Sequence, residues 1–143
     1  MYRRLRQTRA GQNIVEFALL APLFFLLVFG IIEGGRLLWT FHTVSNAAKE
    51  GARYVTVRGA GSSLPDHQPT NEQIKSYILD RTTGLKAENV DVNLTLIDGN
   101  WDDLSRFRVE VDYEHEFIVA TIFGIGSIDL SADSTDMFWR QPN

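Results

Sequence analysis

A single carboxylate at the start of a long apolar segment is the feature of this chain that points most directly to chemistry. Glu16 stands in the motif GQNIVEF, residues 11–17, between an arginine-rich start and an apolar run. An ionisable group in a membrane-spanning segment is costly, so it usually has a function and a partner. Gly11 lies where positive charge gives way to apolar sequence, which is where a processing enzyme at the membrane face could cut. The motif therefore suggests a cleavage site at Gly11 and Gln12 and a functional carboxylate at Glu16.

The charge of the chain is distributed unevenly. Lysine and arginine total 14 against 18 acidic residues, which gives a formal net charge of −4. Four of the arginines precede Gly11 with no acid among them, so cleavage there leaves 10 basic and 18 acidic residues and a net charge of −8. An acidic body is unsuited to nucleic acid, whose binding requires basic patches. The absence of cysteine excludes disulfide and thiolate chemistry.

The segment after the motif has the length and composition of a membrane span. Residues 17–32 carry no charge, and a span needs roughly 17–25 residues, so we assign the transmembrane part to residues 12–35. The positive-inside rule places residues 1–11 in the cytoplasm and the rest of the chain outside. A secretory signal would require a small-x-small cleavage site just after the apolar run. The sequence Glu33-Gly34-Gly35-Arg36 is a poor site of that kind.

The helical pattern continues beyond the apolar run. An apolar stripe recurs at spacings of three and four residues, as on one face of a helix, and the first stop signal comes at residues 59–65. We therefore expect one helix over about residues 14–58, roughly 65 Å long at 1.5 Å per residue. Its amphipathic half, residues 36–58, should pack on the soluble part of the chain. The stripe consists of Leu37, Leu38, Phe41, Val44, Ala47, Ala48, Gly51, Tyr54 and Val55.

Three residues modify the membrane half of this helix. Pro22 removes a backbone hydrogen bond and should kink it. Gly30 and Gly34 form a small-xxx-small pair that lets another helix approach closely. The alternative for the two glycines is a loosely formed helix near the membrane surface, and the sequence favours neither interpretation.

The remaining residues, 59–143, predict a small α+β domain. A short helix is expected over residues 70–79, with Thr70 or Asn71 as its cap and Gly84 as its C-terminal stop. Alternation with a period of two then predicts strands at residues 90–96, 107–117 and about 128–139. The expected fold is α+β and pilin-like: the long helix packs on a small antiparallel sheet of about three strands, with one short helix beside it.

No group of residues in this domain predicts catalysis or a bound cofactor. Asp98, Asn100, Asp102 and Asp103 resemble the beginning of a calcium loop, but the glycine and the closing glutamate of such a loop are missing. A polar hairpin turn explains them better. His115-Glu116 lacks the second histidine of a zinc-protease helix. Four acidic residues of one strand, at positions 110, 112, 114 and 116, form either a solvated face or a contact for a basic partner.

Residues 11–57 resemble a known family. The arginine-rich leader, Gly11, the motif through Phe17 and the unbroken apolar helix resemble a class III, type IV prepilin-like signal. More narrowly, the segment through Asn46-Ala47-Ala48-Lys49-Glu50-Gly51-Ala52-Arg53-Tyr54 is similar to TadE-like minor pseudopilins of tight-adherence (Tad/Flp) pili. Gln12 departs from the hydrophobic first residue that is common in other type IV pilins.

The resemblance implies a non-enzymatic pilus component in the bacterial inner membrane. A prepilin peptidase would cut after Gly11, and Glu16 would pair with the new amino terminus of a neighbouring subunit. Phe17 would join the helix bundle. The implied partners are the peptidase, other pilins and pseudopilins, the Tad assembly platform and the lipid bilayer. The alternative is an unprocessed single-pass envelope anchor or scaffold, for which cleavage and Glu16 would be dispensable.

Overall fold

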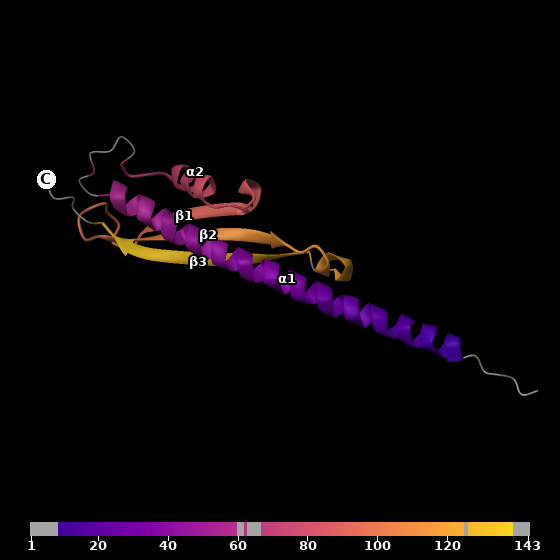
Figure 1. The fold of residues 1–143 in the computed structure, drawn as a ribbon. Helices are drawn as coiled ribbons and strands as arrows, with labels where there is room; N and C mark the ends of the chain where they lie inside the picture. Colours follow the sequence, from indigo (N-terminus) through magenta and orange to yellow (C-terminus); the bar gives the residue numbers. More distant parts are fainter. Residues whose placement is uncertain (1–8, 60–61, 63–66, 125, 139–143) are drawn as a thin grey trace, which may run out of the picture.

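The computed structural model describes residues 9–59, 62, 67–124 and 126–138, and it confirms the α+β fold (Figure 1). A long helix α1 (Arg9–Arg58) and a short helix α2 (Asn71–Arg81) precede the strands β1 (Val90–Leu96), β2 (Arg106–Glu116) and β3 (Ser127–Met137). Two short 3-10 helices, η1 (Ala87–Asn89) and η2 (Ala120–Phe123), precede β1 and β3. Most of the expected leader, part of the linker after residue 59 and the expected end of the third strand at Trp139 lie outside the described residues.

Helix α1 is a single element of 50 residues. It begins at Arg9, earlier than expected, and it ends at Arg58 as predicted. Its N-terminal half projects beyond the sheet, with no other element beside it (Figure 1). That half is long and apolar enough to cross a membrane, and none of its most apolar 18-residue window is buried inside the protein. A helix that is apolar on all sides and has no protein cover is suited to lipid.

The C-terminal half of α1 buries one face against the sheet and α2. Val44, Ala47, Ala48 and Val55 are inaccessible to solvent, as the apolar stripe predicts. The prediction is wrong at the start of the stripe, where Leu38 and Phe41 face outward. The buried face instead continues through two polar residues, Thr40 and Glu33, which the apolar stripe does not include.

Thr40 and Glu33 occupy this face, at 4% and 8% exposure. They lie four and eleven residues before Val44, which are helical spacings, so they share its side of the helix. The hydroxyl of Thr40 donates to the carbonyl of Arg36 at 3.0 Å, which satisfies it within the helix. The hydrophobicity of the residues alone therefore predicted a buried face that is rotated by about one residue from the observed one in this part of α1.

The sheet has three strands in the order β1-β2-β3, and both pairs are antiparallel. In the register, Val92 lies opposite Val111, and Val111 lies opposite Ala132. Strand β2 alternates strictly between buried and more exposed positions, because successive side chains point to opposite faces. Its acidic residues point away from α1, so the four acids expected on one strand face do share the outer face of the sheet.

Helix α2 is capped by Thr70, one of the two caps that the sequence predicts, and it begins with a capping box. The side chain of Thr70 accepts a hydrogen bond from the Gln73 N–H, and the side chain of Gln73 accepts one from the Thr70 N–H. This reciprocal arrangement satisfies two N–H groups that a helix start leaves unpaired. Ile74 and Ile78 are fully buried. Both lie against Gly51 of α1, where a Cβ would come within 2.9 Å of Ile78 Cδ1.

Gly84 has a different role from the predicted one. The helix ends at Arg81 with Thr82 as its C-cap, and Gly84 follows in a turn with φ of +96°. A Cβ at this position would lie 2.2 Å from Cη2 of Trp39. Gly84 is therefore required both by its backbone conformation and by the close approach of the α1 indole ring.

A substitution at Gly84 tests this contact. We expect Gly84→Ala to lower the free energy of unfolding by about 1–2 kcal/mol from the left-handed backbone and by about 1–3 kcal/mol more from overpacking. Gly99→Ala is the matched control, because Gly99 has φ of +74° but open space around its Cα. Denaturant unfolding of the full chain in detergent measures the free energy of unfolding of the two variants and of the wild type. Equal losses for the two variants would show that the Trp39 contact is unimportant.

Candidate functional site

The motif at the N-terminal end of α1 lies on an uncovered helix surface. Gly11, Gln12, Glu16 and Phe17 are all exposed, and Phe17 is 72% exposed. Among the residues that the structure describes, none forms a hydrogen bond or an ion pair with the Glu16 carboxylate. A Cβ at Gly11 would meet no other atom within 4 Å. The motif is therefore accessible along about two turns of helix.

The three residues expected to shape the membrane half of α1 are also on its open surface. Pro22 lies inside the helix, which continues on both sides of it. Gly30 and Gly34 are exposed, and a Cβ at either would meet nothing within 4 Å. Their surface is free to receive a neighbouring helix. The kink and the helix–helix contact stay predictions.

A second group of polar residues lies where α1 leaves the apolar run and reaches the domain. The Glu33 carboxylate accepts hydrogen bonds from the backbone N–H groups of Ile118, at 3.1 Å, and Val119, at 3.2 Å. It also forms an ion pair with Arg36 at 2.9 Å. A carboxylate with several charge-assisted donors is strongly held. Glu33 therefore ties the connection between β2 and β3 to the middle of α1.

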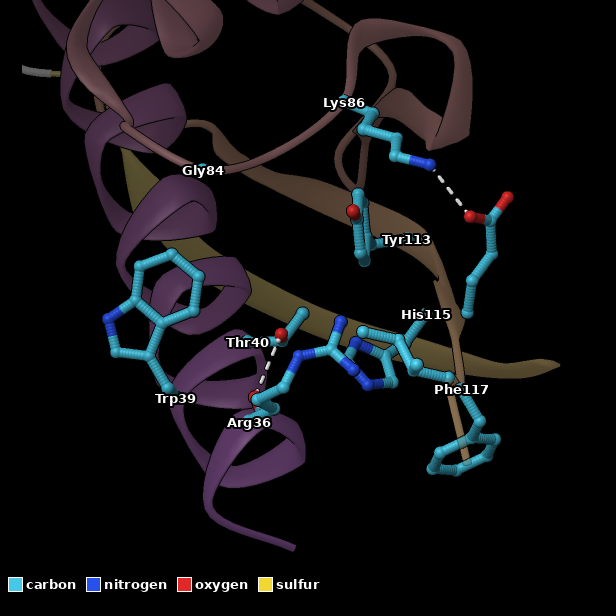
Figure 2. A pocket seen from close by; sticks show the side chains of 10 residues that line it. Arg36, Trp39, Thr40, Gly84, Lys86, Tyr113, His115 and Phe117 are labelled. Carbon is cyan, nitrogen blue, oxygen red and sulfur yellow. Dashed lines mark hydrogen bonds and ion pairs between the residues drawn. The ribbon is translucent and has the colours of Figure 1, made fainter. Parts of the chain in front are cut away.

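A cavity of about 320 Å³ opens beside this junction. Arg36 and Trp39 approach it from α1, Tyr113 and His115 line it from β2, and Lys86 lies at its rim (Figure 2). Lys86 pairs with Glu116 at 2.7 Å. Aromatic side chains thus line much of the cavity. Its cations, Arg36 and Lys86, are each paired with a carboxylate, that of Glu33 and that of Glu116. This arrangement holds the end of the sheet against α1, and we assign no ligand to it.

His115 is the buried titratable group of this junction. Its side chain points to the α1 side of β2 and is 3% exposed. Its ring meets Phe117 edge-on with 5.4 Å between centroids, and its Nε2 has no hydrogen-bond partner. Burial lowers the pKa of His115, and the positive charge of Arg36 lowers it further, against the opposing charges of Glu33 and Glu116. The neutral imidazole is therefore the form that fits the folded domain.

The hairpin that resembles a calcium loop uses its polar side chains internally. Asp98 accepts hydrogen bonds from the backbone and the guanidinium of Arg106, at 2.7 and 2.9 Å. Asn100 donates to Asp102 at 2.9 Å and accepts from the Ser105 hydroxyl. Over the described ranges, no group of three or more histidine, cysteine or acidic residues is arranged to hold a metal ion. These contacts are those of a closed hairpin turn.

Comparison with known proteins bears on the N-terminal part of the chain. Residues 11–53 match the family model described as TadE-like protein. This N-terminal segment is TadE-like. The match confirms the resemblance drawn from the sequence over these residues. It covers the motif, the apolar half of α1 and most of the amphipathic half. No match was found among curated proteins or solved structures.

The TadE-like segment also contains the site residue that sequence reasoning missed. In the sequence Glu33 has significance only as the first charged residue after the uncharged segment 17–32, whereas in the structure it is buried and binds the β2–β3 connection. One signal was available, since Glu33, Thr40 and Val44 lie on a common helical face. The partner could not be found from sequence, because the N–H groups of Ile118 and Val119 carry no side-chain signature.

The buried imidazole predicts a specific pH dependence of stability. Because the pKa of His115 is lowered in the folded chain from the ordinary value of about 6.5, the unfolded chain binds more protons between these two values. Stability should therefore fall as the pH drops below about 6.5, and this loss should be complete below the folded pKa.

His115→Gln should remove this component of the pH dependence. The measurement is the free energy of unfolding of the full chain in detergent between about pH 7.5 and 5.5, a range above the ordinary carboxylate values. The matched control is His42→Gln, because His42 is exposed on α1. The assignment is wrong if His115→Gln keeps the wild-type pH dependence, or if His42→Gln loses it.

Proposed function

We propose that this chain is a minor pseudopilin of a Tad/Flp pilus. It is made as a precursor, cut after Gly11 by a prepilin peptidase, and held in the bacterial inner membrane with its α+β domain outside. It then takes part, without enzymatic activity of its own, in assembling a pilus used for adhesion. The observation that carries the proposal is the TadE-like match over residues 11–53, which lies on one continuous helix reaching from the motif into the domain.

The state of the helix at Gly11 supports processing. Gly11 lies in the first described turn of α1, and that turn contains no acidic residue. Glycine costs about 1 kcal/mol relative to alanine in a helix, so it weakens the helix at this point. The Gly11–Gln12 bond therefore lies where the backbone can open into a peptidase site at small cost.

The charge pattern supports the orientation. Arg3, Arg4, Arg6 and Arg9 precede the apolar run, and the domain that follows has an acidic outer sheet face. Basic residues next to a span are retained on the cytoplasmic side. This would leave the scissile bond at the cytoplasmic face and the domain outside.

Glu16 is the residue that links cleavage to assembly. Its carboxylate is exposed on α1 and lies in the membrane half of the helix, where an unpaired charge is expensive. Cleavage after Gly11 creates a positive α-amino group on Gln12. In a bundle of neighbouring helices, pairing between Glu16 of one subunit and this amino group of another would neutralise both charges. Exposed Phe17 would pack in the same bundle.

Processing is tested by the mass of the chain extracted from membranes of cells that carry a prepilin peptidase. The wild-type chain should lack residues 1–11. Gly11→Trp should retain them, because a bulky side chain replaces the small residue before the cut. Ala18→Leu is the control, since it enlarges an exposed apolar position outside the motif and should be processed normally. An intact wild-type precursor in such cells would favour the unprocessed anchor instead.

A second variant separates assembly from processing. Glu16→Gln keeps the size of the side chain but removes its charge. It should be cut like the wild type and then fail to enter isolated pili. Normal incorporation of this variant would overturn the pairing proposed for Glu16 and leave the processing result standing.

A further inference from the structure

We propose that the turn after β2, residues 117–124, is a membrane-contacting loop that rests on the outer edge of the bilayer through Ile118 and Ile122. The proposal relies on membrane insertion of α1, which is part of the proposed function. It adds a second, independent contact between the domain and the lipid surface. Such a contact would set the height and tilt of the domain over the membrane.

The position of the loop is fixed relative to the apolar run. The uncharged segment ends at Ile32, and the next residue, Glu33, accepts hydrogen bonds from the N–H groups of Ile118 and Val119. The loop is therefore bound to the residue that directly follows the apolar run, and it lies within about one helical turn, roughly 5.4 Å along the axis, of the point where that run stops. Figure 1 shows η2 beside α1 at the end of the sheet that faces the projecting half of the helix.

The exposed side chains of the loop are apolar and large. Ile122 is 79% exposed and Ile118 is 67% exposed. A single exposed apolar residue needs no explanation. Here two isoleucines lie four residues apart in one short turn, next to the end of a segment that can cross a membrane. In water they would leave apolar side chains exposed close to the end of the apolar half of α1, and exposed apolar patches mark interaction sites.

The backbone of the loop is suited to contact with lipid. The Phe117 N–H donates to the Gly126 carbonyl at 3.0 Å and closes the loop. The Thr121 hydroxyl donates to the Phe117 carbonyl at 2.7 Å, and the Ile122 and Gly124 N–H groups bond to Val119 and Thr121. Together with Glu33, these contacts satisfy polar groups that would be costly to leave unpaired near hydrocarbon.

The residues just outward of the loop suit the headgroup layer. Arg36 and Trp39 follow Glu33 on α1, and Lys86 lies across the cavity from them (Figure 2). Trp39 is 54% exposed. Tryptophan is enriched at membrane interfaces. Arg36 and Lys86 are paired with Glu33 and Glu116, so they add a polar but largely neutralised surface at this level. The order along the molecule is therefore apolar helix, isoleucine loop, then aromatic and cationic residues.

The test uses single-cysteine variants of the full chain, which has no cysteine of its own. Ile122→Cys reports on the loop and Phe25→Cys reports on the apolar half of α1. Leu104→Cys is the matched control, because Leu104 is also a largely exposed apolar residue, at 60%, in the turn at the opposite end of β2. Each is labelled with an environment-sensitive fluorophore and reconstituted in phosphatidylethanolamine–phosphatidylglycerol vesicles. Some vesicles contain lipids with a nitroxide near the headgroup, and others contain lipids with a nitroxide near the chain end.

We expect the label at position 122 to be quenched by the nitroxide near the headgroup, and the label at position 104 by neither lipid. The label at position 25 should be quenched most by the nitroxide near the chain end. If position 25 is not quenched, α1 does not insert, and the membrane part of the proposed function fails with the loop proposal. If position 25 is quenched while position 122 behaves like position 104, only the loop proposal is overturned. Quenching at position 122 that disappears as protein density rises would assign the loop to a neighbouring subunit and also overturn it.

Discussion

The carboxylate of Glu33 stands at the point where one helix changes its surroundings from open apolar surface to protein. Before it, α1 has no cover within the described structure; after it, one face of α1 is buried against the sheet. Glu33 connects this part of the helix to the sheet, because its carboxylate accepts hydrogen bonds from the N–H groups of Ile118 and Val119, just after the end of β2. Without this connection the sheet would still pack on residues 44–55, but its end nearest the apolar run would be free to separate from the helix.

The connection at Glu33 would have a mechanical consequence if the chain is a pilus subunit, as proposed. A helix of 50 residues without a break would carry a displacement of its apolar half to the domain. The domain contacts α1 at two successive positions along the helix. Glu33 binds the connection between β2 and β3, and Trp39 packs against Gly84 in the turn after α2. Assembly through the apolar half would therefore fix the orientation of the acidic sheet face as well. This is how a contact at Glu16 could determine which surfaces of two domains meet.

Periodicity was sufficient to predict the elements of this fold but not its junctions. The long helix, the capped α2 and three alternating strands follow from local patterns, since each pattern reflects burial of one face. Leu38 and Phe41 were misplaced because hydrophobicity alone cannot show where a helix face meets another element. Glu33 was missed because its partners are backbone groups. The motif at residues 11–17 was found because costly charge in apolar sequence is itself a signal, yet its cleavage and pairing depend on other molecules and stay predictions.

Hydrogen exchange of the Ile118 and Val119 amides in the full chain in detergent tests most directly whether Glu33 holds the domain to the helix. A hydrogen bond to a charged group contributes about 1.5–3 kcal/mol, so Glu33→Ala should reduce the protection of these two amides by roughly ten- to a hundredfold. The amide of Val111 in the middle of β2 should keep its protection, and Glu114→Ala, which removes an exposed carboxylate of the same strand, should change neither. Unchanged protection of Ile118 and Val119 in Glu33→Ala would contradict the account.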